Sequence, residues 1–294
     1  MRVNPLLSIH LAVLLFGAAG LFGRVLTLPP TLIVLGRVVF AAAALAIAVE
    51  VRRRRQGGAA PDRPTPERSH RAWISRAVLG LLLAVHWVAF FQAIQVSSVA
   101  VGLLTFATFP VFAAVLEPLL PGERFDARTL GAALVTLVGV GLVVPTPDLN
   151  NPVVQGALWG VFSGFTFALL SLANRTLVRQ ESALTLALHQ DMWAAAFLLP
   201  FAFTSVRPPT AEEWGLLVLL GVVFTAGAHA LFIRGLRGVS AGRASVITAL
   251  EPVYGVLLAW QLLGERPELR TLAGGALVLG AAAWVGTSSE VEDA

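Results

Sequence analysis

A few ionisable side chains lie inside stretches that are otherwise apolar: Arg37, His86, Glu117, His189, Asp191, His229 and Glu251. Such groups can bind ions or exchange protons, and His86, Asp191 and Glu251 are the candidate acid–base groups of an intramembrane enzyme. No G-x-S-x-G, H-E-x-x-H or phosphate-binding glycine loop accompanies them. His189 and Asp191 are two residues apart, so they do not share a helical face. We therefore expect no catalytic set, no metal and no cofactor, and no ATP-driven pump.

The composition indicates what surrounds these groups. The 294 residues are 56% hydrophobic and only 13% charged, with a mean hydropathy of +0.78, whereas soluble domains carry about 25% charged residues. There is no cysteine and no lysine, and the arginines other than Arg37 lie at or between the ends of the apolar runs. We expect a lipid bilayer around most of the chain and no nucleic-acid partner.

The apolar runs predict an all-α integral membrane protein of ten spans. Continuous apolarity rich in Gly and Ala favours helices over a membrane barrel. The first run is too long for a signal-peptide core and is interpreted as a true span. The predicted spans are 6–26, 30–50, 73–95, 98–120, 128–145, 153–177, 183–204, 213–236, 240–263 and 269–287.

The arginines predict the orientation. With the N-terminus in the cytoplasm, the cytoplasmic segments hold most of them, including the run from Arg52 to Arg55. The opposite side holds few: Arg24, Arg207, Arg266 and Arg270. Positive charge favours the cytoplasmic side, so both termini are expected there.

An internal repeat divides the chain. "FPVFAAVLEPLLPGERFDARTLGAALV" (109–135) matches "EPVYGVLLAWQLLGERPELRTLAGGALV" (251–278) at a constant offset, with Pro110 on Pro252 and Glu123 on Glu265. Two units of five helices follow, residues 1–148 and 149–294, the second ending in a short acidic tail. Because five is odd, the second unit enters the membrane from the opposite side. We predict two inverted repeats around a central cavity, as in many secondary transporters.

The matched phrase P-x-x-x-x-x-L-x-x-x-x-x-G-E-R, followed by a Gly/Ala-rich span, resembles the EamA-type drug/metabolite transporter superfamily. Within it, the chain looks most like bacterial amino-acid exporters of the YddG type. The resemblance implies a cavity lined by spans 1, 3, 4, 6, 8 and 9, with spans 5 and 10 as peripheral supports. Small multidrug relatives carry an essential carboxylate in the first helix, and run 6–26 has none.

Glu251 and the two prolines are the sharpest candidates within the membrane. The repeat partner of Glu251 is Phe109, so the repeat alone does not require the acid. It can bind a substrate ammonium or act as a protonatable switch, or it can be a structural acid paired with Arg37 or bonded to a backbone carbonyl. Pro110 and Pro252 each remove a helical N–H and predict paired kinks that act in gating or are static.

Other candidate substrate contacts lie on predicted cavity helices: His86, Phe90, Thr105, Thr108, Trp159 and Ser163. Thr105, Thr108 and Phe112 form one stripe at helical spacing, and Trp159, Ser163 and Thr166 form another. Such hydroxyls also bond their own helix, so a structural role is the alternative. Gly131 and Gly139 on span 5, and Ala276 and Gly280 on span 10, suit either internal packing or a homodimer, so the protein is a monomer or a homodimer.

These features together predict a secondary transporter of a bacterial inner membrane, not an enzyme. We expect it to export small amphiphilic metabolites, amino acids including aromatic ones first, by alternating access. The alternatives are a nucleoside, purine or drug exporter, an intramembrane enzyme and a passive channel.

Overall fold

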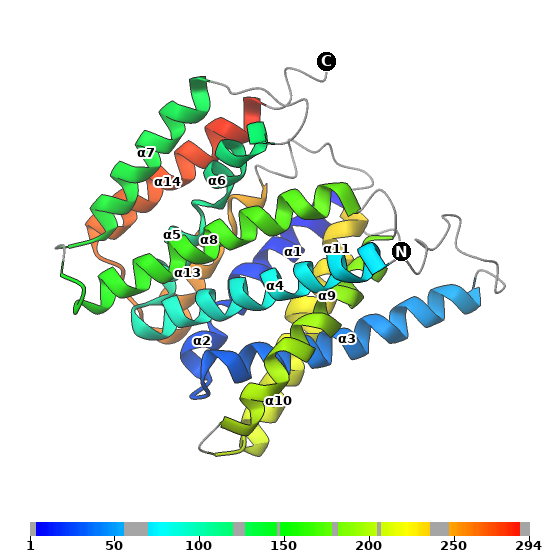
Figure 1. Ribbon diagram of the computed structural model, residues 1–294. Helices are drawn as coiled ribbons and strands as arrows, with labels where there is room; N and C mark the ends of the chain where they lie inside the picture. The colour runs from blue at the N-terminus through cyan, green and yellow to red at the C-terminus, as the bar shows by residue number, and fades with distance from the viewer. Residues whose placement is uncertain are drawn as a thin grey trace.

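Helices make up every regular element of the part of the chain that the structure, a computed structural model, describes: residues 4–55, 70–119, 127–145, 148–177, 182–204, 207–235 and 247–288. The predicted all-α class is therefore confirmed over these residues (Figure 1). The first half of the chain holds α1 (Pro5–Ala19), α2 (Phe22–Val25), α3 (Pro30–Arg55), α4 (His70–Val96), α5 (Val99–Phe106), α6 (Phe109–Leu116), the short 3₁₀ turn η1 (Glu117–Leu119) and α7 (Ala127–Val143).

The second half continues in the same way. It contains one π-helical segment, η3, in the middle of a longer helix. Its elements are α8 (Pro152–Leu177), α9 (Ala183–Leu198), the 3₁₀ segment η2 (Leu199–Thr204), α10 (Ala211–Gly221), η3 (Val222–Gly227), α11 (Ala228–Gly235), α13 (Glu251–Leu263) and α14 (Leu269–Ser288).

Short polar signals fix where several helices begin. Ser98 accepts a hydrogen bond from the backbone N–H of Val101 at the start of α5, 3.1 Å away. Thr210 and Glu213 form a reciprocal capping box at the start of α10. These side chains satisfy N–H groups that have no partner within the helix.

Within the described residues, seven helical segments are long and apolar enough to cross a membrane. They correspond to predicted spans 1 to 4 and 6 to 8. Predicted spans 5 and 10 contain the shorter apolar helices Leu130–Val143 and Leu269–Trp284, and predicted span 9 contains α13, which has 13 residues. The first residues of the predicted span 240–263 lie outside the described part, so the total of ten spans stays a prediction.

Two of the predicted spans are broken at equivalent places. The helix of span 4 stops at Phe106 and resumes as α6 at Phe109. In span 9, residues 249–250 form a turn and α13 begins at Glu251. Each new helix carries its proline, Pro110 or Pro252, in the first turn, where a missing N–H costs nothing. The predicted kinks are therefore complete breaks.

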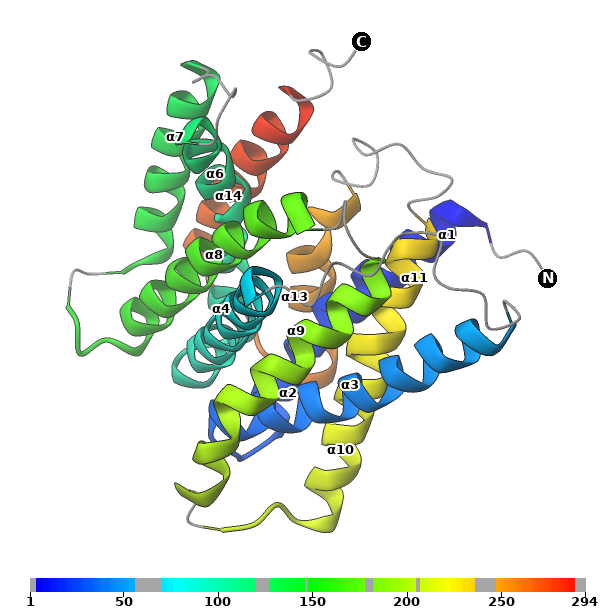
Figure 2. The ribbon, with the colours of Figure 1, turned by 45° about the vertical axis from the view of Figure 1, so that its right-hand side comes forward.

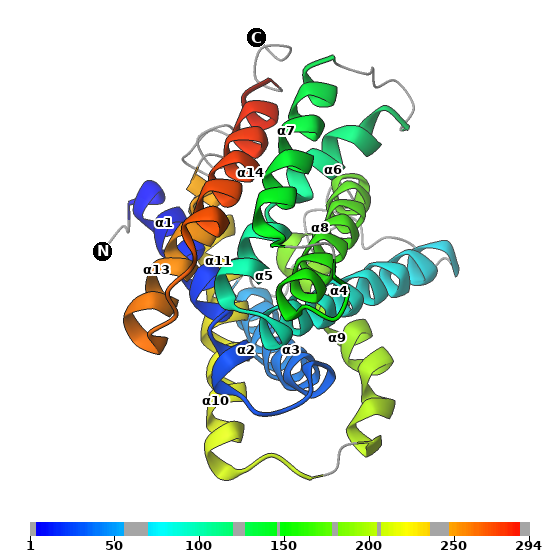
Figure 3. The same ribbon diagram turned by 90° about the vertical axis from the view of Figure 1, so that its left-hand side faces the viewer.

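Helices far apart in sequence pack in pairs. α7 lies along α14, as Figures 1 and 3 both show, and α3 lies against α9. α8 packs on α4, α5 and α6, while α1 packs on α11 and α13. A Cβ at Gly139 would lie only 2.7 Å from the carbonyl oxygen of Gly274, so these two glycines pack within the chain, whereas nothing lies within 4 Å of a Cβ at Gly280. A homodimer remains a prediction.

Glycines allow the closest of these contacts. A Cβ on Gly164 of α8 would lie 2.8 Å from the carbonyl oxygen of Phe106, the carbonyl that precedes Pro110 by four residues. A Cβ on Gly17 of α1 would lie 2.6 Å from the carbonyl oxygen of Glu251. Both helix breaks are therefore covered by a glycine of a helix from the other half of the chain.

The helices run between two distinct ends, which Figure 2 shows in one view. α2 and the starts of α8 and α10 lie in the lower part of this view. The start of α1 and the end of α14 lie in the upper part. The arginine distribution predicts that the first of these ends is non-cytoplasmic, and this orientation stays a prediction.

Candidate functional site

A central cavity of about 590 Å³ lies between helices from both halves of the chain. Its volume is within the usual range for small-molecule sites. All six spans that the resemblance assigns to a cavity contribute to its wall, and α3, α9 and α14 contribute as well. Most lining side chains are aromatic or apolar; the polar ones are Arg37, His86, Ser171, Asn174, Gln190, His229, Thr248 and Glu251.

Aromatic rings cover one wall without interruption. Phe106 stacks on Phe109 at 5.2 Å between ring centroids, and Phe109 meets Phe167 of α8 edge-on at 4.9 Å. Phe90, a predicted contact on α4, packs against Phe106 at 5.5 Å and lines the cavity. This wall suits an apolar or aromatic ligand body.

Arg37 forms the main positive charge of the cavity. The residue is 4% exposed, and its guanidinium carbon lies 3.8 Å from the ring centroid of Trp87. Its Nε donates to Thr225 Oγ1 at 2.8 Å. Within the described residues its two terminal nitrogens make no hydrogen bond and no ion pair. The sequence marked Arg37 as a buried cation but did not identify it as a binding residue.

Thr225 is placed by the π-helical turn η3. Its hydroxyl donates to the carbonyl of Leu220, five residues earlier, at 2.8 Å. Its carbonyl lies 3.0 Å from Nδ1 of His229, another lining residue. π-Helical turns often occur at functional sites because they change which side chains face a ligand.

Glu251 begins α13 and faces the same cavity as Arg37. No ion pair joins the two within 4.0 Å, so the structural alternative of a direct salt bridge does not hold in this conformation. Among the described residues the Glu251 carboxyl has no hydrogen-bond partner either. Pro110 and Pro252, the predicted gating residues, both line the cavity beside the helix breaks.

His86 is held by a reciprocal contact with Ser163. Nδ1 of His86 lies 3.1 Å from the Ser163 carbonyl oxygen and 2.9 Å from Ser163 Oγ, which donates to the His86 carbonyl at 3.0 Å. His86 lines the cavity, whereas Ser163 is fully buried behind it. This pair joins α4 to α8.

Thr105 and Thr108 do not face the cavity. Each donates to a carbonyl of the same chain segment, Thr105 to Val101 at 2.6 Å and Thr108 to Thr105 at 2.8 Å. Their hydroxyls pack against Gly160 and Gly164 of α8. The stripe that was expected to point at a ligand instead fills the α5–α8 seam, and the break at residues 107–108 ends its helical spacing.

Trp159 also lies away from the cavity. It is 41% exposed on the outer surface of α8 and packs against Phe162. The signal that the sequence did offer on this helix is the spacing of Gly156, Gly160 and Gly164, which marks the face that contacts α4 and α5. Gln190 and Asn174, joined at 2.6 Å, are lining residues that sequence reasoning missed.

Asp191 is buried near Arg37 but does not line the cavity. His189, two residues before Asp191 in the sequence, is half-buried. Over the described ranges, no three His, Asp or Glu side chains gather closely enough to hold a metal ion. The cavity therefore combines an aromatic wall with one cation and one acid.

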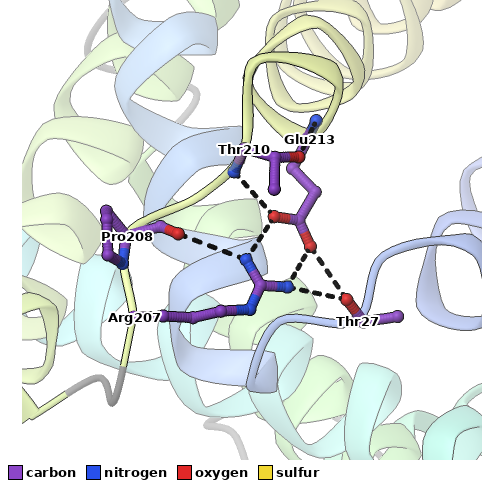
Figure 4. Close-up of polar contacts among 5 residues, drawn as sticks. All are labelled: Thr27, Arg207, Pro208, Thr210 and Glu213. Carbon is purple, nitrogen blue, oxygen red and sulfur yellow. Dashed lines mark hydrogen bonds and ion pairs between the residues drawn. The ribbon is translucent and has the colours of Figure 1, made fainter.

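Two polar clusters tie the halves together at the end where α3, α10 and α14 begin. In the first (Figure 4), Arg207 binds both carboxylate oxygens of Glu213 at 2.7 Å and also the Thr27 hydroxyl at 2.8 Å. The bond to Glu213 raises the pKa of Arg207 above its ordinary value. Thr27 precedes α3, so the cluster joins the two halves.

In the second cluster, Glu265 links Arg24 to the start of α5. Its Oε1 lies 2.9 Å from Arg24 Nε, and its Oε2 accepts from the backbone N–H of Val99 at 2.9 Å. Glu265 therefore caps the start of α5. Its repeat equivalent, Glu123, lies outside the described residues.

Comparison with known proteins identifies relatives over most of the chain. The model of the EamA-like transporter family matches residues 4–144 and 154–287. An uncharacterized transporter of Archaeoglobus fulgidus is 29% identical over 213 residues, 72% of this chain and 75% of that protein. The pseudopaline exporter CntI of Pseudomonas aeruginosa is 27% identical, covering 69% and 71%. The S-adenosylmethionine uptake transporter of Rickettsia bellii is 26% identical, covering 70% of each.

A solved crystal structure shares the fold. It aligns over 97% of this chain and 96% of its own, with a TM-score of 0.64 and 21% sequence identity. At that identity the match concerns the arrangement of helices alone.

Proposed function

This chain belongs to the EamA-like transporter family, and we propose that it is a secondary transporter that exports small amphiphilic metabolites, amino acids first, by alternating access. The relatives with which it aligns are named as transporters, and their names include both an exporter and an uptake system. Export and the YddG-type amino-acid specificity therefore rest on the resemblance of the repeat motif.

The observation that carries the proposal is the central cavity, which helices of both halves enclose and which contains an aromatic wall, Arg37 and Glu251. A cavity of this kind suits a ligand with an apolar body and charged groups. In the mechanism, the Glu251 carboxylate binds a substrate ammonium, and Phe90 and its neighbours contact the apolar part.

Inverted five-helix repeats, split near residue 148, are part of the proposal. The family model matches the chain twice, and both halves have a break before the proline. The packing of the helices has the same symmetry. If spans 1 to 5 are equivalent to spans 6 to 10, the contact of span 1 with span 8 is equivalent to that of span 6 with span 3, and span 5 packs on its own equivalent, span 10. Single cysteines at Arg124 and Arg266 should react with an impermeant reagent from opposite sides, the former from the cytoplasm. Reaction from one side would overturn the repeats.

Access from one side only is inferred from the polar contacts between the halves. The cavity lining includes Phe167 and Leu279 in the later parts of α8 and α14, and also Ala19 at the end of α1 and Arg37 in the first part of α3, so the cavity lies in the middle of the bundle. The two polar clusters, built around Glu213 and Glu265, lie at the end where α3, α10 and α14 begin. We assign the structure to a state that is closed on the non-cytoplasmic side and accessible from the cytoplasm.

Pro110 and Pro252 are the proposed hinges of the exchange. Each lies in the first turn of a helix, beside a break that faces the cavity. Pro252→Ala should slow exchange while leaving substrate affinity within about twofold, because it removes the ring that prevents the helix from continuing through the break. Unchanged exchange rates would leave the breaks with a packing role only.

Counterflow in liposomes tests the function. The purified protein is reconstituted and labelled amino acids are exchanged against unlabelled amino acids, nucleosides and drugs. Saturable, exchange-stimulated uptake of amino acids supports the proposal. If only nucleosides or drugs exchange, the protein is a transporter of that substrate class instead of amino acids. Linear flux would indicate a channel, and chemical conversion of the substrate without its movement would indicate an enzyme.

A further inference from the structure

We propose that Arg37 is the residue that binds the carboxylate of the transported substrate, opposite the ammonium-binding Glu251. This inference rests on the proposed function and narrows the substrate class to compounds that carry a carboxylate, with zwitterions that have an apolar body preferred.

The first argument is the position of Arg37. An arginine at the depth of the bilayer costs about 2.5–3.5 kcal/mol on insertion scales, so it faces protein or water and has a partner. Arg37 is 4% exposed and lines the central cavity. Asp191 and Glu251 are near enough to interact with it electrostatically, but neither forms an ion pair within 4.0 Å.

The second argument is the way the guanidinium is held. Thr225 accepts from Nε at 2.8 Å, and Trp87 covers one face of the guanidinium at 3.8 Å. These contacts fix the plane of the group and leave its two terminal nitrogens without a hydrogen bond among the described residues. Two parallel N–H donors on a fixed plane match the two oxygens of a carboxylate.

The third argument is the rest of the cavity. Glu251 has no hydrogen bond in the described chain and lines the same cavity, so it supplies the opposite charge for an ammonium. In the same cavity, Phe106, Phe109 and Phe167 supply the apolar wall. Neither the Arg37 guanidinium nor the Glu251 carboxylate has a bonded partner of opposite charge among the described residues. A zwitterionic ligand can bind both groups, while a neutral ligand leaves both unpaired.

The experiment compares ligand pairs that differ only in the carboxylate. The probes are L-phenylalanine with L-phenylalaninamide, L-leucine with L-leucinamide, and nicotinate with nicotinamide. Inhibition of counterflow and thermal stabilisation in detergent are measured for each. For the wild-type protein we expect the acid to act at a concentration at least tenfold lower than its amide.

Arg37→Gln should reduce that preference to about twofold or less, and Arg37→Lys should retain part of it, because lysine keeps the charge but not the planar pair of donors. Arg270→Gln is the control; Arg270 pairs with Glu268 outside the cavity, and this variant should keep the full preference. If Arg37→Gln does not fold, Thr225→Val keeps Arg37 but removes its Nε acceptor, together with the hydrogen bond from Thr225 to the Leu220 carbonyl, and should weaken the preference several-fold.

The outcomes separate the two proposals. If amino acids exchange but acid and amide act equally, or if Arg37→Gln keeps the wild-type preference, the assignment of Arg37 is overturned and the transporter stands. If no probe exchanges or stabilises the protein while nucleosides or drugs do, the proposed substrate class falls and the inference falls with it.

Discussion

At the scale of single residues, the polar side chains serve two different purposes within this membrane protein. Arg37 and Glu251 face the cavity without bonded partners in the described chain, whereas Ser163, Thr105 and Thr108 use their hydroxyls inside helix seams. A buried hydroxyl that already donates to a backbone carbonyl has little left to offer a ligand. The open groups are therefore the ones to test for binding.

Ser163→Ala tests the structural role of the His86 pair. The change removes the hydrogen bond from Ser163 Oγ to the His86 carbonyl and the contact with Nδ1. Hydrogen bonds between membrane helices contribute about 0.6 kcal/mol on average and up to about 1.7. We expect the free energy of unfolding in detergent to fall by an amount within this range, and the affinity for substrate in counterflow to stay unchanged. A large loss of affinity at unchanged stability would make Ser163 a substrate contact instead.

At the scale of elements, glycine seams and helix breaks occur together. Gly156, Gly160 and Gly164 let α8 approach α4 and α5, and Gly17 and Gly255 do the same for α1 and α13. Close backbone contact without bulky side chains allows tight packing in lipid, where no hydrophobic force drives helices together. Each seam joins a broken helix to a helix of the other half.

Gly160→Ala should destabilise the fold, because its Cβ would overlap the hydroxyl of Thr105. Overpacking of this kind costs about 1–3 kcal/mol. The control is Gly141→Ala on α7, where nothing lies within 4 Å of the added carbon and where better helix propensity predicts about 0.5–1 kcal/mol of stabilisation. Both are measured by unfolding in one detergent. Equal stability of the two variants would show that Gly160 is not needed for the close contact of α8 with α5.

At the scale of the whole molecule, two polar clusters join the halves at one end of the helices, and in the proposed mechanism they keep that end closed. Arg207, Glu213 and Thr27 join the loop before α10 to the loop before α3. Glu265 joins α2 to the start of α5. Alternating access requires these contacts to separate when the cavity opens to the non-cytoplasmic side.

Glu213→Gln should shift the population toward that open state, because it removes the carboxylate that Arg207 binds with two hydrogen bonds. The chain has no cysteine, so Ala19→Cys places a single thiol in the cavity wall. When an impermeant thiol reagent is added outside right-side-out vesicles, this thiol should react several-fold faster in the Glu213→Gln protein than in the Ala19→Cys parent.

Glu268→Gln provides the matched control, since it breaks an ion pair with Arg270 that spans only two residues of the chain. Its labelling rate should equal that of the parent. Equal rates in the Glu213→Gln and Glu268→Gln proteins would show that the Arg207 cluster does not hold the cavity closed.

The sequence alone determined the helical class, the places where helices begin and the two breaks. Caps such as Thr210 and Ser98, and prolines such as Pro252, act on their own neighbours, so their effect can be derived locally. Long apolar runs and their arginine-bearing connections likewise indicate a lipid environment without reference to tertiary contacts.

Only the tertiary structure decided which side chains share the cavity. In a soluble protein the apolar face of a helix points inward, but in lipid both the outer surface and the interior are apolar, so the sequence does not fix how each helix is rotated. For this reason the sequence did not show that Trp159 faces outward and that Thr105 faces a glycine. It also did not show that Arg37 and Glu251, which are far apart in the sequence, line the same cavity.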